Sequence, residues 1–262
     1  MSPHRTVFAD RFAARITQHE ILDDHEPEQA VVDRIYAFLA MVNRRFGGTQ
    51  ATIARFEEVS RSWKPGERIE VLDIASGAAD VPRALIQWGR EHGFDVRVTA
   101  LDISQSALDY ARRAGPGDAR LRLLCADITR PFCQDQSFDY VTSALFFHHL
   151  TDAQIVDTLR LSDRLARRGI VVNDLVRSPR AWMLTWLLTW PFHPILHHDG
   201  PLSVRRALTP DEMLALARQA GVPWLSIGRH FGERMTLAGE RPREAAEEGC
   251  LPGQKDEVRS TK

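Results

Sequence analysis

The chain has 262 residues, of which 44% are hydrophobic and 26% charged, and these proportions are ordinary for a soluble globular protein. The formal net charge of −1 gives no strong field that would attract nucleic acid or an anionic membrane. The cysteines, Cys125, Cys133 and Cys250, form neither a disulfide framework nor a C-x-x-C metal pair, so we expect a cytoplasmic protein.

Two further features argue against targeting and membrane segments. The opening residues, MSPHRTVFAD, lack the apolar core of a secretion signal. The most apolar stretch, residues 181–196, contains two prolines and is short for a membrane span. We therefore expect no stable membrane insertion.

Residues 1–64 are predicted to form a helical N-terminal lid. Apolar residues recur at helical spacing in residues 36–46 and 51–63, and a glycine pair separates the two segments. At the other end, residues 240–262 are charged and poor in apolar residues, which is typical of a disordered tail. The main domain is thus expected to span residues 65–239.

From residue 69 the chain alternates between strand and helix patterns. The strand segments are β-branched and nearly continuous in apolar residues, as expected when helices cover both faces of a parallel sheet. The order predicts a doubly wound α/β domain with a mostly parallel, seven-stranded sheet. Strands are expected at 69–75, 96–102, 120–127, 138–147 and 168–175, helices at 80–93, 104–115, 152–168 and 209–221, and two short strands at 224–231 and 234–239 to close the sheet.

The first strand runs into a turn of small residues, VLDIASGAAD (71–80). A dinucleotide pyrophosphate requires the pattern G-x-G-x-x-G, but this turn contains only Gly77. S-adenosylmethionine has no phosphate, and its amino-acid end and sulfonium require a tight turn near negative charge. The turn favours that cofactor, because Gly77 permits close approach and Ala75, Ala78 and Ala79 leave room.

Three carboxylates end the first three strands, at the edge where ligands lie in such sheets. Asp102, after the second strand, is placed to accept hydrogen bonds from both ribose hydroxyls. Asp127, after the third strand, is placed to accept a hydrogen bond from an adenine amino group. The alternative is that its carboxylate only stabilises the turn after that strand. Asp73 lies where a cationic ligand group is favoured, or it only braces the turn.

Four segments in series resemble the motifs of class I S-adenosylmethionine-dependent methyltransferases, over residues 69–175. They are VLDIASGAAD, VTALDIS, LLCADI and FDYVTSALFFHHL. The resemblance implies a Rossmann-like methyltransferase fold with S-adenosylmethionine as cofactor. It also implies cofactor contacts from Gly77, Asp102, Asp127 and Ser143, with Ile103 and Ile128 packing on the adenine. The chain departs from the family's D-x-G-x-G-x-G pattern at Ala75 and Ala79.

Two histidines follow the fourth strand, in LFFHHLTDAQ (145–154), and Asp174 ends the fifth. Because these strands are neighbours in this fold, His148 or His149 is expected to meet Asp174. Such a pair is the arrangement of a general base that a carboxylate holds in one tautomer. Small-molecule O-methyltransferases similar to this sequence use a His–Asp dyad at the matching positions. We therefore predict transfer to a hydroxyl, with His148 as the base and Asp174 as its partner.

Other interpretations stay open. The H-H-L segment also occurs in class I methyltransferases that methylate carbon in quinone precursors, and a methyltransferase-like scaffold can bind cofactor without catalysis. A metal-assisted mechanism requires an aspartate at the end of strand four, where the chain has Thr142–Ser143–Ala144, so we expect no metal. The Asn/Asp-Pro-Pro-aromatic motif of DNA-base methylation is missing there too, so we expect no nucleic-acid substrate.

Residues 176–208 form an apolar insertion after the fifth strand. Trp182, Trp186 and Trp190 follow one another at i, i+4 and i+8 and share one helix face, and Pro191 should end that helix. The three indoles are expected to roof the acceptor pocket, to pack in the core or to face a membrane. Arg44 is expected to close over the cofactor carboxylate or the substrate, or else to lie on a solvated helix face.

The stretch HPILHHDGPLSVRRALTP (193–210), with EILDD (20–24) and NRRFGG (43–48), resembles bacterial methyltransferases near the ubiquinone/menaquinone-type enzymes. Members are often associated with type III polyketide products. The resemblance implies a small, hydrophobic, phenolic or polyketide-like acceptor and a role in secondary metabolism.

Overall fold

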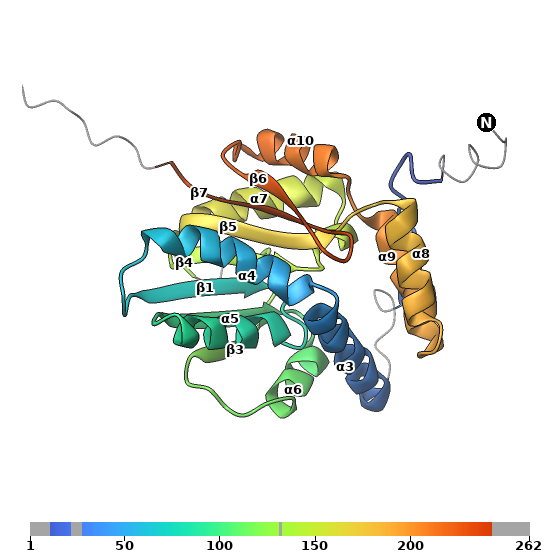
Figure 1. Cartoon of the computed structure of the whole chain (residues 1–262), viewed down its shortest axis with the longest axis horizontal. Helices are drawn as coiled ribbons and strands as arrows, with labels where there is room; N and C mark the ends of the chain where they lie inside the picture. The colour runs from blue at the N-terminus through green and yellow to red at the C-terminus, as the bar shows by residue number, and fades with distance from the viewer. Residues whose placement is uncertain (1–10, 22–27, 131–132, 243–262) are drawn as a thin grey trace, which may run out of the picture.

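The computed structural model describes residues 11–21, 28–130 and 133–242, and an open seven-stranded sheet forms its centre (Figure 1). The strand order is β3-β2-β1-β4-β5-β7-β6. The first five strands pair in parallel, and β7 runs antiparallel between β5 and β6, which confirms the predicted fold class. The strands are β1 (Arg68–Ile74), β2 (Asp95–Asp102), β3 (Leu121–Cys125), β4 (Phe138–Ala144), β5 (Ala166–Leu175), β6 (Ser226–His230) and β7 (Arg234–Glu240).

Helices cover both faces of this sheet. On one face lie α4 (Gly48–Val59), α5 (Asp80–Glu91) and α6 (Gln105–Arg113), and on the other α7 (Asp152–Leu165) and α10 (Pro210–Ala220). The apolar strands supply both faces, so Val71 packs under α4 and α5 whereas Leu72 packs under α7 and α10. Capping boxes at Thr151 and Thr209 start α7 and α10.

Three helices extend beyond the carboxyl ends of the strands. They are α3 (Gln29–Arg45), α8 (Pro179–Thr189) and α9 (Pro194–Arg206), and α8 and α9 pack against each other (Figure 1). Within the expected N-terminal lid, α3 belongs to this layer, whereas α4 packs on β5 and β7. No helix in the described ranges is both long and apolar enough to cross a membrane.

Residues 11–21 run along this layer and are held by two arginines. Arg177 is buried, and its Nε and Nη2 donate to the carbonyls of Phe12 (2.9 Å) and Ala13 (3.5 Å). The same guanidinium also binds Glu212 through two hydrogen bonds. In return, Arg15 donates to the carbonyls of Arg206 and Leu150. The segment is therefore fixed to α9, to Arg177 after β5 and to the loop after β4.

Some helix and strand boundaries differ from the predicted ones, because strand pairing overrides the helical pattern of the sequence. The helix expected at 152–168 ends at Leu165, because Ala166 already pairs with Phe138 across β4 and β5. The strands expected at 224–231 and 234–239 extend the sheet and do not close it: β6 forms one free edge and β3 the other. As predicted, α8 ends before Pro191. Of the predicted tail, residues 243–262 lie outside the described residues.

A buried hydrogen-bond chain under α4 makes one stability prediction. The ring nitrogen of Trp63 donates to the Tyr140 hydroxyl at 2.8 Å, and that hydroxyl donates to Glu240. Tyr140→Phe leaves the Trp63 N–H without its acceptor, so we expect the free energy of unfolding to fall by about 1–3 kcal/mol in urea titrations followed by circular dichroism. Tyr110→Phe is the control, and equal losses in both variants would contradict the prediction.

Candidate active site

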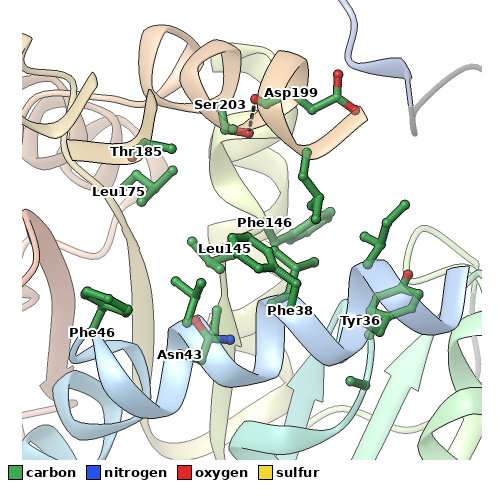
Figure 2. Close-up of a pocket in the computed structure, with 18 of the residues that line it drawn as sticks. Tyr36, Phe38, Asn43, Phe46, Leu145, Phe146, Leu175, Thr185, Asp199 and Ser203 are labelled. Atoms are coloured by element: carbon green, nitrogen blue, oxygen red, sulfur yellow. Dashed lines mark hydrogen bonds between the residues drawn. The ribbon is translucent and has the colours of Figure 1, made fainter. Parts of the chain in front are cut away.

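A cavity of about 1450 Å³ lies between the carboxyl ends of the strands and the layer of α3, α8 and α9 (Figure 2). At one end it is polar, where the turn after β1 and the end of β2 contribute Asp73, Gly77 and Asp102. At the other end, side chains of α3 and α8 make it apolar. His148 lies in the wall with His149 and Glu20. The cavity is larger than the roughly 300–1,000 Å³ of most small-molecule sites, which gives room for two ligands.

The turn after β1 takes the shape of a glycine-rich turn although it holds a single glycine. Ala75, Gly77 and Ala79 have φ angles of 56°, 50° and 53°, in the left-handed region. For alanine this conformation costs roughly 1–2 kcal/mol. At Gly77 a side chain is excluded as well, because a Cβ would lie 3.1 Å from a Tyr36 ring carbon. The departures from the family pattern at Ala75 and Ala79 therefore leave the turn unchanged.

Asp102 braces this turn from the end of β2. Its carboxylate accepts from the backbone N–H groups of Gly77 at 2.7 Å and Ser104 at 2.8 Å. Burial raises the pKa of Asp102. Ile103, the next residue, is 72% exposed and lines the cavity. An apolar side chain beside a buried carboxylate suits a purine base joined to a ribose.

Asp73 supplies an unpaired acceptor at the polar end. Its Oδ2 accepts from the Ser76 hydroxyl, whereas its buried Oδ1 has no hydrogen-bond partner among the described residues. Burial raises the pKa of Asp73 to about 8, and the charges of Asp80 and Asp102 add to this effect. A ligand that brings a positive charge to Oδ1 would satisfy the orphaned atom. The site thus fits the ammonium group of S-adenosylmethionine.

Three of the predicted cofactor residues do not line the cavity. Asp127 accepts from the N–H and the hydroxyl of Thr129, and these bonds lower its pKa. Ile128 packs against the core next to α7. Ser143 is buried within β4, and Leu145, two residues on, lines the cavity instead, with a strained φ of 58°.

His148 and Asp174 meet, as the order of strands implies. Nδ1 of His148 lies 2.7 Å from one Asp174 carboxylate oxygen, and the His148 backbone N–H donates to the other at 2.9 Å. Both side chains are buried. Burial acts to raise the pKa of Asp174. The charge of His148 and the hydrogen bonds that Asp174 accepts from His148 and from the N–H of Leu175 outweigh burial and lower this pKa below its usual range. An ionised Asp174 must accept, so Nδ1 carries a proton, and in the neutral form of the ring Nε2 is the acceptor atom.

Glu20 is a site residue that sequence reasoning missed. Its buried carboxylate lies 4.0 Å from Nε2 of His148 and accepts from the Ser203 hydroxyl at 2.8 Å. Arg206 lies 3.7 Å from the same oxygen. Ligand atoms of Glu20, His148 and His149 all lie within 4.8 Å of one another, so these residues could hold a metal ion. No local signal in EILDD (20–24) indicates this placement, which depends on the docking of residues 11–21.

Arg234, at the start of β7, was also missed. Its side chain is buried and lines the cavity, and one nitrogen, Nη1, has no partner among the described residues. The other donates to Asn43, which in turn donates to Asp80. Burial lowers the pKa of Arg234 to about 10, so it stays charged at neutral pH. Arg44, the predicted arginine, lies exposed outside the cavity.

The three tryptophans share a face of α8, but the other face lines the cavity. Leu184, Thr185 and Leu188 are the lining residues, and Thr185 is seen there in Figure 2. Trp186 packs edge-on against Trp190 and lies near His197 of α9, and Trp182 does not line the cavity either. The helical period is therefore as predicted, but the face of α8 that lines the cavity carries smaller side chains than tryptophan.

Comparisons with known proteins agree with this geometry. Residues 71–169 match the family model of a methyltransferase domain. Human N-acetylserotonin methyltransferase in complex with SAM superposes with a TM-score of 0.61 at 14% identity, covering 82% of this chain and 57% of that one. The plantazolicin methyltransferase BpumL in complex with SAH gives 0.58 at 12% identity, covering 82% and 95%. A SAM-dependent methyltransferase from Aquifex aeolicus gives 0.52 at 15% identity, covering 82% and 99%.

These likenesses show the fold, and the family match extends over the part of the chain that carries the four motifs. No curated protein matches the sequence. The chain spans little more than half the length of the human protein. Residues 71–169 therefore match a methyltransferase domain, and solved structures of similar fold are in complex with SAM or SAH.

The buried Asp73 predicts a pH dependence of stability. A carboxyl whose pKa is raised to about 8 keeps its proton in the folded state between roughly pH 4 and 8, while the unfolded chain loses it. The free energy of unfolding should therefore fall as the pH rises through this range. Asp73→Asn removes the effect, so at pH 8 it should unfold at higher urea than the wild type and bind cofactor more weakly. If the difference in free energy of unfolding between the wild type and Asp73→Asn does not change with pH, the raised pKa is contradicted.

Proposed function

We propose that the chain methylates a hydroxyl of a small hydrophobic aromatic or polyketide-like acceptor, with S-adenosylmethionine as methyl donor and His148 as general base. The observation that carries this proposal is the buried His148–Asp174 pair, whose imidazole lines the cavity. A base at this position can reach an acceptor that enters from the apolar side.

Residues of the polar end would hold the cofactor. Asp102 retains lone pairs for the ribose hydroxyls, and Ile103 offers an apolar contact for the adenine. Asp73 Oδ1 would take the ammonium group and Arg234 Nη1 the carboxylate, so that these two buried atoms would each gain a partner of opposite charge. Asp127, Ile128 and Ser143 remain candidates for the margin of this site, and Arg44 for its outer rim.

When bound, S-adenosylmethionine supplies a methyl group on a positively charged sulfur. The residues of the chain act on the acceptor. His148 Nε2 takes the hydroxyl proton as the new O–C bond forms, and Asp174 stabilises the resulting imidazolium through Nδ1. Glu20, 4.0 Å from Nε2, adds a second negative charge beside that cation. The apolar side chains of α3 and α8 exclude water from the reacting atoms.

Asp102→Ala tests the cofactor site. The variant removes the acceptor for two hydrogen bonds to a charged group, each worth about 1.5–3 kcal/mol. We expect the Kd for S-adenosylmethionine to rise at least tenfold in calorimetry, and NAD to bind neither protein. Unchanged affinity would show that this carboxylate does not hold the ribose.

His148→Ala tests the base. Turnover should fall by roughly 10²–10⁴, with unchanged cofactor affinity, in assays with labelled methyl donor and phenolic acceptors. His197→Ala, on α9 outside the cavity, is the matched control and should keep full turnover. Near-full turnover in His148→Ala would exclude it as the base, and a label found on ring carbon would indicate C-methylation.

A chelator separates this mechanism from a metal at Glu20, His148 and His149. Because the proposed base acts through a free Nε2, activity should survive EDTA and fall when Zn²⁺ occupies the three side chains. Activity that EDTA abolishes and a divalent cation restores would instead assign His148 as a metal ligand.

A further inference from the structure

Three potential metal ligands meet in the wall of the cavity from two distant parts of the chain. Glu20 lies in the segment 11–21, and the two histidines belong to the 3₁₀ turn η2 (Phe147–His149) that follows β4. One ligand atom of each lies within 4.8 Å of the other two, and the Glu20 oxygen is 4.0 Å from Nε2 of His148. Ligand atoms around a tetrahedral zinc ion stand about 3.3 Å apart, so shifts on the order of 1 Å bring these three into coordination.

His148 already has the orientation of a metal ligand. Its Nδ1 lies 2.7 Å from Asp174, and this carboxylate is itself held by the backbone N–H groups of His148 and Leu175. Metal-binding histidines in proteins usually donate their second ring N–H to a carboxylate in this way, which fixes the tautomer and the direction of the other nitrogen. In the neutral ring the lone pair of Nε2 therefore points away from Asp174, on the side where Glu20 lies.

The charges around the imidazole favour a cation at Nε2. Glu20 and Asp174 are both buried, and they flank the ring at its two nitrogen atoms. Arg206, at 3.7 Å from the same Glu20 oxygen, offsets part of this negative charge. Buried carboxylates are stabilised by a positive charge brought beside them. A metal ion at Nε2 gains the same attraction as the proton of an imidazolium, and it binds Glu20 directly.

The donor set selects the class of ion. Two imidazole nitrogens and one carboxylate oxygen suit Zn²⁺, whereas Mg²⁺ and Ca²⁺ prefer shells made of oxygen. Three protein ligands leave a fourth coordination position, and it opens on the cavity because Glu20, His148 and His149 all line it. Water or a hydroxyl of the acceptor completes the shell there. The three residues therefore form an open site, which exchanges its ion with the cavity.

We propose that Glu20, His148 and His149 form an inhibitory Zn²⁺ site. The inference rests on the proposed function, because the ion takes the Nε2 lone pair that would otherwise accept the proton of the acceptor hydroxyl. Nδ1 keeps its proton in the bond to Asp174. None of the proposed cofactor residues at the polar end of the cavity is a ligand, so Zn²⁺ stops methyl transfer while S-adenosylmethionine still binds.

The ion also joins two parts of the chain. Glu20 and His148 are 128 positions apart, and coordination adds a direct link from the segment 11–21 to the loop after β4. An ion that binds the folded state and not the unfolded chain raises stability as its concentration rises. Occupation of the site is therefore visible as a rise in Tm, which does not depend on turnover.

The test uses the full chain without an affinity tag, saturated with S-adenosylhomocysteine for the binding measurements. Calorimetry should give one Zn²⁺ per chain, and Tm should rise with its concentration. Assays with labelled methyl donor should lose activity in step with this binding. EDTA should restore the activity, whereas additional S-adenosylmethionine should not, because the two occupy different places.

Glu20→Gln and His149→Ala each remove one ligand. The Kd for Zn²⁺ should rise at least about tenfold in both variants, since even residues that only orient a metal ligand contribute roughly 10–100-fold in affinity. Glu20→Gln keeps an oxygen that accepts from the Ser203 hydroxyl, so the segment retains that contact. His197→Ala, outside the cavity, is the control for other histidines and should bind Zn²⁺ as the wild type does.

The outcomes separate this site from the proposed reaction. Zn²⁺ binding that needs Glu20 and His149, in a protein that transfers no methyl group to oxygen, supports the site and overturns the reaction. Transfer to oxygen that depends on His148 but is not inhibited by Zn²⁺, with no rise in Tm, overturns the site and leaves the reaction standing. Equal Zn²⁺ affinity in the wild type and both ligand variants, all folded by circular dichroism, also overturns the site, and activation by Zn²⁺ overturns its inhibitory role.

Discussion

One buried carboxylate holds the acceptor side of this molecule together. Asp174 accepts from the backbone and the ring of His148 and from the N–H of Leu175, so it ties the loop after β4 to the end of β5. The bond from the His148 backbone fixes where the loop runs, and the bond from the ring fixes how the imidazole points. The course of the loop and the orientation of the imidazole thus depend on the same two oxygens. A side chain at position 174 that cannot accept hydrogen bonds through two atoms would release both the loop and the ring.

The polar end shows how a conformation can be kept when its usual residues are replaced. Ala75 and Ala79 adopt backbone angles that favour glycine. At Gly77 a methyl group would lie 3.1 Å from a Tyr36 ring carbon, so the ring would have to shift. The strain at the two alanines is compensated by the hydrogen bonds of the turn, among them Gly77 to Asp102 and Ala79 to Ser76.

Sequence patterns predicted the mostly parallel seven-stranded sheet, and the resemblance implied that its fourth and fifth strands are neighbours, where His148 or His149 was expected to meet Asp174. They did not predict what depends on docking across the chain. Glu20 reaches His148 over 128 positions, and Arg234 reaches the cavity by way of an antiparallel strand. The helical period of α8 was predicted, but not which face turns to the cavity, because apolar side chains lie on most sides of α8.

The strap formed by residues 11–21 has a consequence for the order in which the molecule is made. Two of its anchors, Arg177 and Arg206, lie 165 and 191 positions downstream of Phe12 and Arg15, to which they bond. A chain that leaves the ribosome N-terminus first must carry Glu20 unattached until β5 and α9 have emerged. Nascent chains long enough to pair β1 with β4 would therefore still lack one wall of the site, which is complete only once α9 has been synthesised.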